Sequence, residues 1–462
     1  MTNYQLPELD DSIFKAYDIR GIVDSNLTAD VVHQVGKALG STNLDDGGKT
    51  IVVARDGRLS GPSLLQALID GILSTGCNVV NIGRVPTPVL YFGTFHLDAG
   101  SGVMLTGSHN PPKYNGLKMV INGHTLSGDD IQTLKQRIIN QDFHTGTGEY
   151  SEQDISDEYI DRITGDIKLK RPLKLAVDCG NGVAGELAPK LFKALGCDVT
   201  EMYCEIDGNF PNHHPDPSQP DNLVDLINKV THTDYEVGFA FDGDGDRLGV
   251  VAPDGEVIWP DRQMILYAQD VLSRMPGAEI IYDIKCSRNL EQAITEAGGK
   301  PLMWQTGHSL VKAKLKETGA PLAGEMSGHI FFKERWYGFD DALYTGARML
   351  EILSAHEDTG NVFKDLPNMI NTPELRIEMQ EGAHHEFMVE LQAEASFSEA
   401  RVTTIDGLRA DFEHGWGLVR ASNTTPCLVI RFEGRDDSAM QAIQEEFRDL
   451  FTRLDDSLKL PF

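Results

Sequence analysis

The sequence contains no run of about 18 apolar residues, so it offers no candidate for a membrane-spanning helix. Its first eight residues lack the basic and apolar segments of a secretory signal, and we expect none there. Cysteine is scarce, because only six are scattered through 462 residues, with no C-x-x-C spacing. This usage argues against a disulfide framework and favours reduced thiols in the cytoplasm.

Basic side chains are also in the minority, since 41 lysines and arginines face 70 aspartates and glutamates, for a net charge of −29. So acidic a surface repels nucleic acid and anionic membranes, and we expect neither as a partner. An anionic small-molecule partner would need a local group of cations. Each candidate could equally be half of a surface salt bridge. The candidates, all inside the motifs described below, are Arg20, Lys118, Arg247, Lys285 and Arg420.

One hydroxyl stands at the tip of a loop stiffened by two prolines. The loop, TGSHNPPKYNGLK at residues 106–118, follows the apolar run 102–105, which predicts a buried strand. A rigid loop at a strand end is where an α/β protein presents a reactive side chain. Ser108 has His109 beside it and Lys118 in the same segment. Cationic neighbours suit a covalent phosphate, which brings about −1.5 to −2 charge, better than an acyl group.

Three aspartates alternate with glycines in the run DGDGDR at residues 242–247, directly after the strand-like run 237–241. In extended backbone alternate side chains share one side, and Gly243 and Gly245 let the backbone bend, so we expect Asp242, Asp244 and Asp246 to meet. Crowded carboxylates repel one another unless a cation lies between them, and hard oxygen ligands suit Mg²⁺. A calcium EF-hand needs Gly and Glu where this run continues with Arg and Pro. The other alternative is an acidic turn in solvent.

A glycine fingerprint, G-x-G-x-x-G at residues 180–185, points to a different chemistry. It follows a predicted strand, and Glu205 stands where the ribose-binding acid of a dinucleotide site would be expected. The simpler interpretation is a tight turn between a strand and a helix. A nicotinamide enzyme would explain neither the aspartate run nor the serine loop, so we disfavour it. A serine hydrolase is also disfavoured, because G-x-S-x-G does not occur in the chain.

The order of the predicted elements indicates several α/β domains followed by a different one. Through three quarters of the chain, strand-like runs alternate with helical patterns, as in parallel or mixed sheets. Three strand-like runs end in polar loops, TGSHNP, DGDGDR and GEMSGH, as if one unit were used three times. The last block predicts an α+β domain with an antiparallel sheet. The expected strands include 50–54, 77–82, 102–105, 173–177, 279–282 and 427–432, and the expected helices include 64–74, 130–139 and 438–454.

Four motifs in this order resemble the α-D-phosphohexomutase superfamily, and most closely its bacterial phosphomannomutase/phosphoglucomutase branch. They are TGSHNPP, DGDGDR, GEMSGH at 324–329 and RASNTT at 420–425, and the similarity extends from IFKAYDIRG at 13–21 to the C-terminal residues. The resemblance implies three similar α/β domains with mixed sheets and a C-terminal α+β domain around a central cleft. The expected domains are residues 1–152, 153–255, 256–366 and 367–462, with the serine, metal, sugar and phosphate loops in that order.

The resemblance further implies a phosphoserine enzyme. Ser108 would carry a phosphoryl group, and Mg²⁺ would be held by Ser108 together with Asp242, Asp244 and Asp246. Phosphate would move between C1 and C6 of mannose or glucose phosphates through glucose 1,6-bisphosphate or its mannose counterpart. The partners would be small-molecule hexose phosphates and the protein a monomer, supplying sugar 1-phosphates for nucleotide-sugar and surface polysaccharide synthesis.

Substrate contacts also follow from the resemblance. The 420–425 loop offers a guanidinium, hydroxyls, an amide and backbone N–H groups for a phosphate dianion. Glu325 and Ser327 would bind sugar hydroxyls. The candidates for proton transfer are Arg20, His109, Lys118 and His329, and we assign Lys118 and His329 to it. The expected substrate contacts are Tyr17, Arg247, Arg262, Lys285, His308, Glu325, Met326, Ser327, Gly328, His329, Arg420, Ser422, Asn423, Thr424 and Thr425.

Two alternatives stay open at this point. The first is phosphoglucosamine mutase, a branch that usually has Ala where Gly107 stands and a different residue at Met326. The second is a non-catalytic sugar-phosphate binding protein, in which Ser108 is only a polar loop residue. Binding alone needs no group of three carboxylates, so the sequence favours an enzyme.

Overall fold

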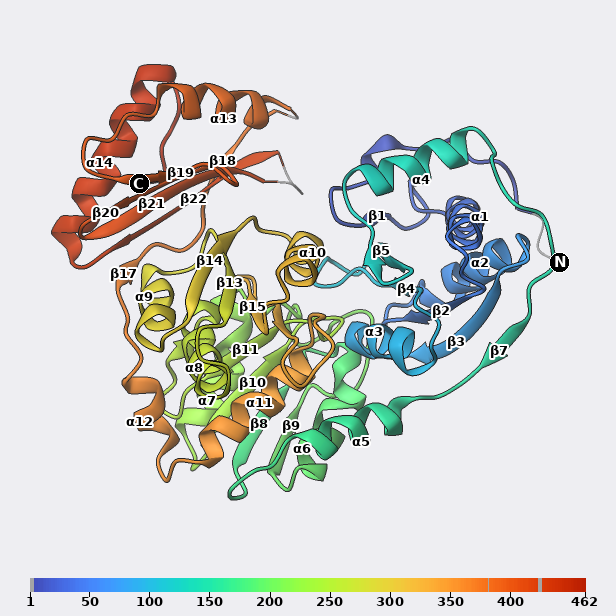
Figure 1. Ribbon diagram of the computed structural model, residues 1–462, viewed down its shortest axis with the longest axis horizontal. Helices are drawn as coiled ribbons and strands as arrows, with labels where there is room; N and C mark the ends of the chain where they lie inside the picture. The colour runs from blue at the N-terminus through green and yellow to red at the C-terminus, as the bar shows by residue number, and fades with distance from the viewer. Residues whose placement is uncertain (1–3, 381, 423–425) are drawn as a thin grey trace.

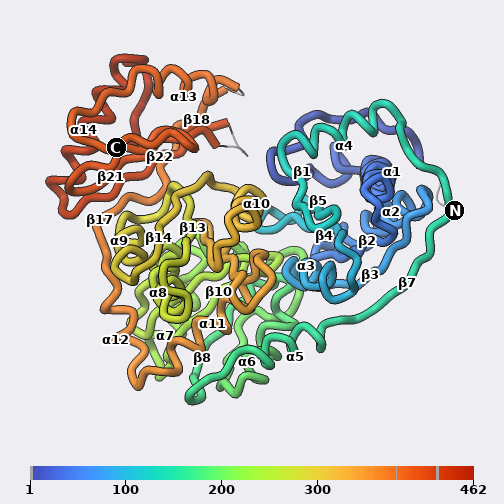
Figure 2. Tube along the Cα trace, viewed as in Figure 1, coloured from blue at the N-terminus to red at the C-terminus, as the bar shows by residue number. Residues whose placement is uncertain are grey.

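The computed structural model describes residues 4–380, 382–422 and 426–462 and divides into four sheets. In Figure 1 the first domain, blue to teal, lies on the right, and the green to orange second and third domains pack against each other. The red fourth domain stands beside the third, and Figure 2 shows the long connection that leaves the first domain through β7. Within the described residues, no helix has both the length and the apolar character needed to cross a membrane.

The first sheet has seven strands in the order β1-β5-β4-β2-β3-β7, with β6 paired to β5. Strands β2, β3, β4 and β7 are parallel, and β5 is antiparallel to each of its neighbours β4, β1 and β6. The strands are β1 Ile19–Ile22, β2 Thr50–Arg55, β3 Asn78–Arg84, β4 Gly102–Leu105, β5 Tyr114–Ile121, β6 His124–Thr125 and β7 Tyr150–Glu152. The helices are η1 Asp11–Ile13, α1 Ala29–Asp45, α2 Gly61–Leu73, α3 Thr87–His96 and α4 Asp129–Ile139.

The second sheet has five strands in the order β12-β11-β10-β8-β9, of which β8, β9 and β10 are parallel. The strands are β8 Lys174–Asp178, β9 Asp198–Met202, β10 Val237–Phe241, β11 Leu248–Val251 and β12 Val257–Ile258. The helices are α5 Ser156–Asp166, η2 Val183–Glu186, α6 Ala188–Ala194, η3 Pro220–Leu223 and α7 Val224–Thr231. Because β12 pairs with β11, this sheet continues past the expected boundary at residue 255, which falls in the turn between them.

The third sheet has four strands in the order β14-β13-β15-β16, with only β16 antiparallel. The strands are β13 Glu279–Asp283, β14 Lys300–Trp304, β15 Leu322–Gly324 and β16 Ile330–Phe332. The helices are α8 Pro260–Arg274, α9 Arg288–Glu296, α10 His308–Thr318, α11 Ala342–Ser354 and α12 Thr359–Lys364.

The fourth sheet is antiparallel throughout, in the order β17-β22-β21-β20-β19, with β18 paired to β22. The strands are β17 Ile370–Asn371, β18 Leu375–Glu378, β19 Arg401–Thr403, β20 Leu408–Phe412, β21 Gly415–Ala421 and β22 Cys427–Gly434. Two helices, α13 Ala383–Glu394 and α14 Asp437–Leu454, cover one face (Figure 1). The expected α+β domain is confirmed.

The expectation of one unit used three times is also supported by topology. In each of the first three sheets a parallel strand is followed by an antiparallel neighbour: β4 by β5, β10 by β11 and β15 by β16. The serine loop, the aspartate loop and the GEMSGH loop are these three connections. The fold therefore places the three polar loops at equivalent positions, each at the carboxyl end of a buried parallel strand.

The apolar cores divide the molecule unevenly. One cluster of buried side chains extends from Val52 in the first domain to Leu366 at the end of the third. The fourth domain has its own core, which includes Phe432 and Phe447. A small cluster that includes Ile284 of the third domain and Trp416 of the fourth lies between them. The first three domains therefore share an apolar core, although the first domain also has one of its own that includes Val31 and Leu68, and the fourth folds around a separate one.

Candidate active site

Ser108 lies in the loop between β4 and β5 and is 1% exposed. Its backbone has a φ of 49°, in the left-handed region that non-glycine residues rarely adopt. Its Oγ donates a hydrogen bond to Asp242 Oδ2 at 3.1 Å and lies 3.1 Å from Nδ1 of His109. The expected nucleophile therefore meets the first aspartate of the metal loop.

A buried arginine that the sequence analysis did not single out holds the serine loop. The guanidinium of Arg58 donates to four backbone carbonyls of this loop, and its Nε donates to Asp56 at 3.1 Å. The carbonyls and their distances are Ser108 at 2.7 Å, Asn110 at 2.6 Å, Pro111 at 2.8 Å and Tyr114 at 2.9 Å. The only sequence signal was the run DGR directly after a predicted strand.

The glycine before Ser108 is required by the position of Arg58. A Cβ at Gly107 would lie 2.4 Å from Cζ of Arg58, far inside van der Waals contact. Asp56 also holds the start of the serine loop, because it accepts hydrogen bonds from the hydroxyl of Thr106 at 2.8 Å and from the amide of Gly107 at 3.2 Å. The serine loop is thus fixed through its backbone.

The three aspartates meet as expected, but in a turn and not in extended backbone. Residues 243–245 form the turn between β10 and β11, with Gly245 at a φ of 77°. One oxygen from each of Asp242, Asp244 and Asp246 lies within 4.8 Å of the others, and all three side chains are fully buried. The glycines bend the chain here, as expected, so the carboxylates meet around a turn and not along a strand.

The aspartate loop also packs tightly against the serine loop. A Cβ at Gly243 would lie 2.4 Å from the carbonyl oxygen of Ser108. On the other side, Thr87 donates from its amide to the carbonyl of Asp244 at 2.8 Å and from its hydroxyl to Asp244 Oδ2 at 2.6 Å. The loop therefore has little freedom to move away from the serine.

Lys118 supplies a positive charge inside this acidic group. Its Nζ donates to Asp244 Oδ2 at 2.7 Å and also to Asp246 Oδ2. Burial alone would lower the pKa of Lys118, but Asp244 and Asp246 outweigh it and raise that pKa. Burial, with the neighbouring charges of Asp244 and Asp246, raises the pKa of Asp242 well above its usual range.

The donor set fits a divalent cation. Oδ1 of Asp244 and Oδ1 of Asp246 are buried and have no hydrogen-bond partner among the described residues. One ammonium group cannot balance three carboxylates, so the cluster keeps an excess of negative charge. Unpaired carboxylate oxygens in such a cluster are hard ligands of the kind that bind Mg²⁺.

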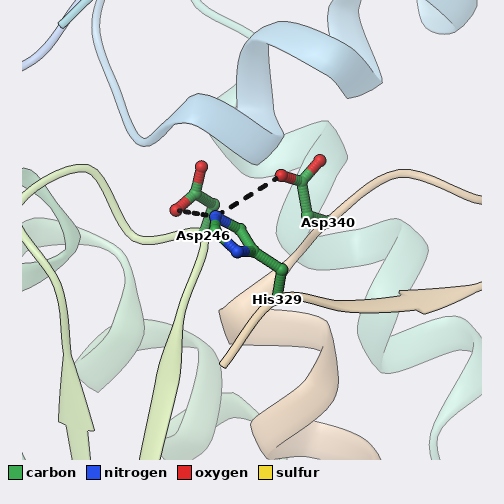
Figure 3. A group of neighbouring side chains, drawn as sticks. All are labelled: Asp246, His329 and Asp340. Carbon is green, nitrogen blue, oxygen red and sulfur yellow. Dashed lines mark ion pairs between the residues drawn. The ribbon is translucent and has the colours of Figure 1, made fainter. Parts of the chain in front are cut away.

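A second group joins the aspartate loop to the GEMSGH loop, as Figure 3 shows. His329 Nε2 lies 3.5 Å from Asp246 Oδ1 and 4.0 Å from Asp340 Oδ2, and Nδ1 is 2.8 Å from the hydroxyl of Ser327. Asp340 is also paired with Lys312 at 2.9 Å. The sequence analysis missed Asp340, which no motif contained.

Two other candidate histidines have lowered pKa values. Burial, followed by the positive charges of Arg247, Arg20 and Lys118, lowers the pKa of His109 well below its usual range. Burial, followed by Lys312 and Lys118, does the same for His308. His109 is therefore neutral beside Ser108, in contrast to the cationic neighbour that the sequence suggested.

Contacts lead from the aspartate loop toward the third domain. Arg247 and His329 form an isolated antiparallel bridge, and Nε of Arg247 donates to the His329 ring at 3.3 Å. Glu325 accepts from the amide of Gly307 at 2.6 Å, and burial raises its pKa to about 6. The second and third polar loops are thus joined directly.

The remaining contacts reach the first and fourth domains. Tyr17 donates its hydroxyl to the carbonyl of Thr306 at 2.9 Å. The amide of Thr306 donates to Asp406 at 3.0 Å, and the same carboxylate accepts from Nε of Arg420 at 3.1 Å. Lys285 pairs with Glu374 at 2.9 Å across the same boundary. Asp406 and Glu374 were not foreseen from sequence.

Other expected residues are placed less centrally. Arg20 contacts the serine loop through Asn110 and pairs with Asp18 at 2.5 Å. Arg262 donates to Glu256 at 2.6 Å and to carbonyls that precede the fourth domain, so its partners lie outside the serine and aspartate loops. Met326 packs against the shared core, Gly328 has a φ of 103°, and Ser422 is buried. Asn423, Thr424 and Thr425 lie outside the described residues.

Comparisons with known proteins agree with this fold and site. Models of the phosphoglucomutase/phosphomannomutase family match in four parts: α/β/α domain I at residues 11–145, domain II at 157–255, domain III at 259–370 and the C-terminal domain at 374–450. A phosphomannomutase/phosphoglucomutase of Pseudomonas aeruginosa is 53% identical over the full length of both chains. A phosphoglucomutase of Neisseria gonorrhoeae is 53% identical over 94% of this chain and 96% of its own.

A solved structure gives the same result. The crystal structure of a phosphoglucomutase/phosphomannomutase family protein from Burkholderia thailandensis is 55% identical, with a TM-score of 0.94 over 98% of this chain and all of that one. Four domains that join a serine loop to a buried aspartate loop define the α-D-phosphohexomutase class. Within that class, this chain belongs to the phosphoglucomutase/phosphomannomutase family.

Proposed function

We propose that this protein catalyses the reversible transfer of phosphate between C1 and C6 of mannose and glucose phosphates. The observation that carries the proposal is the contact between Ser108 Oγ and Asp242 Oδ2 at 3.1 Å, inside a buried cluster of three aspartates. Binding of a sugar phosphate alone would not require a serine hydroxyl beside three buried carboxylates. A serine that carries a phosphoryl group needs a concentration of positive charge there, which a bound cation provides.

Asp242, Asp244 and Asp246, with the phosphoryl group on Ser108, would hold one Mg²⁺. The ion would supply the Lewis-acid charge that stabilises the transferring phosphoryl group. Lys118 adds a fixed positive charge, and its raised pKa favours this role over that of a base. His329 is the better candidate for moving a proton, because its ring nitrogens lie near Asp246, Asp340 and Glu325.

The far end of the substrate would be bound by the third and fourth domains. Arg420 is oriented by Asp406, and Lys285 by Glu374, so each cation keeps a fixed position. Glu325 lies between these cations and the aspartate loop, where it can accept sugar hydroxyls. Both phosphates of glucose 1,6-bisphosphate can then be bound at once, so that this intermediate, which also activates the enzyme, can return its second phosphate to Ser108.

One chain is expected to suffice, because all assigned residues belong to it, so we propose a monomer. All six cysteines are free thiols, which is in keeping with the reducing cytoplasm. There the product sugar 1-phosphates would feed nucleotide-sugar and polysaccharide synthesis.

A coupled assay tests the proposal. Purified protein would be given glucose 1-phosphate, mannose 1-phosphate or glucosamine 1-phosphate, each with magnesium or with a chelator. We expect comparable, magnesium-dependent turnover of the first two and much slower turnover of the third. Mass spectrometry should find one added phosphate on Ser108 after incubation with glucose 1,6-bisphosphate. Turnover that survives both chelation and Ser108→Ala would reject the mechanism.

A further inference from the structure

A cavity of about 470 Å³ lies between the first and second domains, at the carboxyl ends of β2, β3 and β7. In α/β sheets ligands bind in the crevice at this edge of the parallel strands. The serine loop leaves the same edge of the same sheet from β4. The residues that line the cavity include Arg55, Arg84, Asn81, Glu152, Gln153 and Ser156, and none of the active-site residues proposed above lines it.

Two arginines occupy adjacent strand ends at this cavity. In the parallel pairing of β2 with β3, Val53 is opposite Asn81 but Arg55 is opposite Arg84, so β3 has one extra residue. Gly83 provides the bulge, with a φ of 84°. Without the bulge Arg55 would be opposite Gly83, so the irregularity is what places the two arginines opposite each other on adjacent strands. Bulges of this kind often direct a side chain to a functional position.

The two cations are only partly paired. Among the described residues, the one hydrogen bond of the Arg55 side chain is from Nη1 to the carbonyl of Asp56, at 3.0 Å. Arg84 has an exposed ion pair with Glu186 at 3.5 Å. Burial, and then the charge of Arg84, lowers the pKa of Arg55. Glu152, Asp154 and Glu186 also line the cavity, so an anion would have to bind at the end that holds the two arginines and take the place of Glu186 beside Arg84.

We propose that this cavity is a second binding site, which takes a small molecule with a phosphate group on a hydroxyl-rich body. The phosphate would lie between Arg55 and Arg84, whose planar groups suit phosphate oxygens. Asn81, Gln153 and Ser156 offer hydrogen bonds for hydroxyls, and Glu152 can accept more. The volume lies within the range of about 300–1,000 Å³ that is usual for small-molecule sites.

The aspartate loop separates this cavity from Ser108. A Cβ at Gly245 would lie 3.1 Å from Cβ of Pro86 and 3.4 Å from Cβ of Ala184, two residues beside or in the cavity wall. Thr87, which follows Pro86 in the sequence, donates hydrogen bonds to both the backbone carbonyl and the carboxylate of Asp244. The second site is therefore a neighbour of the catalytic loop, and it does not depend on the proposed reaction.

Binding of inorganic phosphate and of glycerol 1-phosphate, measured by titration calorimetry on the full-length protein, tests the proposal. The Arg420→Ala variant is the background, because it weakens anion binding at the catalytic site. In that background we expect glycerol 1-phosphate to bind, and the further change Arg84→Ala to weaken it by about tenfold or more, as for a lost charge-assisted hydrogen bond. Arg84→Lys should retain part of the affinity.

The matched control is Lys190→Ala, which removes a nearby exposed cation that pairs with the same Glu186, at 3.7 Å, but does not line the cavity. It should leave binding unchanged. Equal affinity with and without Arg84, equal losses in the Arg84 and Lys190 variants, or no binding in the Arg420→Ala background would each overturn the second site. Mutase turnover of the single Arg84→Ala variant, followed in parallel, reports on the proposed function separately.

Discussion

Two buried arginines, Arg58 and Arg409, each hold a loop by donating hydrogen bonds to its backbone carbonyls, in two different parts of this molecule. Arg58 donates to carbonyls of the serine loop within the first domain, and Arg409 donates to the carbonyls of Ile284 at 2.6 Å and Cys286 at 2.8 Å from the fourth domain. Arg58 belongs to the part of the chain that shares one apolar core, whereas Arg409 stands at a boundary between two cores, against Trp416.

Under the proposed function, the first side of this comparison carries the phosphoryl transfer and the second side, in the fourth domain, binds the substrate. The loops that carry Ser108 and the aspartates are fixed to each other by backbone packing, as the position of Gly243 shows. Arg420, near the end of β21, is joined to the third domain by polar contacts, because Asp406 accepts from both Arg420 and Thr306, and Glu374 pairs with Lys285 across the same boundary. Changes on the first side should therefore lower kcat, and changes on the second side should raise KM.

The strongest test of this comparison is Arg58→Lys. A lysine presents three donors from one point and cannot reach four carbonyls and Asp56 at once. A displacement of the nucleophile by about 1 Å can cost about 100-fold in rate, and we expect a fall in kcat of that size with little change in KM. Steady-state kinetics with glucose 1-phosphate measures both.

Arg137→Lys provides the matched control for that variant. Arg137 is in the same domain, but it donates hydrogen bonds to Thr42 at 2.8 Å and to Asp45. Both partners belong to α1 and not to the serine loop. It should keep full turnover. An Arg58→Lys enzyme with unchanged kcat would show that the serine loop is held by other means.

Gly107→Ala tests the same contact between Gly107 and Arg58, this time by changing the glycine. The new methyl group would meet the Arg58 guanidinium at 2.4 Å, and overpacking of this kind costs about 1–3 kcal/mol. We expect kcat to fall about tenfold, which corresponds to about 1.4 kcal/mol of activation free energy.

Gly165→Ala is its control, since a Cβ at that position in α5 would have no neighbour within 4 Å. Replacing a helical glycine should raise the free energy of unfolding by about 0.5–1 kcal/mol and leave kcat unchanged. Equal kinetic effects of the two substitutions would contradict a specific role for Gly107.

On the fourth-domain side, Arg409→Lys should act on KM. Loss of about 1 kcal/mol from the hydrogen bonds to Ile284 and Cys286 would loosen the orientation of Arg420. We expect the KM for glucose 1-phosphate to rise about fivefold and kcat to change less. A fall in kcat as large as that of Arg58→Lys would mean that the two sides are not separable.

The last prediction concerns the pH dependence of stability, not turnover, and two aspartates that begin helices, one on each side. Asp341 accepts from the amide of Tyr344 at 2.9 Å and from the hydroxyl of Tyr159 at 2.8 Å, and burial raises its pKa to about 7. The folded protein therefore holds a proton that the unfolded chain has released. Stability should fall as pH rises from about 4 to 7, by at most about 1.4 kcal/mol per pH unit from this group.

Asp341→Asn should remove that contribution, and urea unfolding at pH 5, 6, 7 and 8 would measure the change in slope. Asp436→Asn is the counterpart in the fourth domain, at the start of α14. There a hydrogen bond from the amide of Ala439 lowers the pKa of Asp436, so its contribution is lost only in acid. The same slope for wild type and Asp341→Asn would exclude Asp341 as the source.

The sequence predicted the elements well where periodicity and loop chemistry agreed. The strands at 102–105 and 237–241 have the expected bounds, and the polar loops follow them as expected. The bend of the aspartate run was expected from its two glycines, although alternation alone does not distinguish a strand from such a turn. The domain boundary near residue 255 stays a prediction, since the matched domain II ends there while β12 pairs with β11 across it.

The candidate site could be predicted only where a motif carried it. Arg58, Asp340 and Asp406 act through contacts between segments far apart in sequence, and the spacing of residues contains no information on such contacts. The neutrality of His109 was equally hidden, because it depends on burial and on Arg247 from another domain.

The ammonium group of Lys118, seated between Asp244 and Asp246, has one more consequence. Its charge offsets part of the repulsion within the acidic centre, so the chain should stay folded when no cation is bound there. Under the proposed mechanism, removal of the metal should stop turnover without unfolding the protein, and its return should restore turnover.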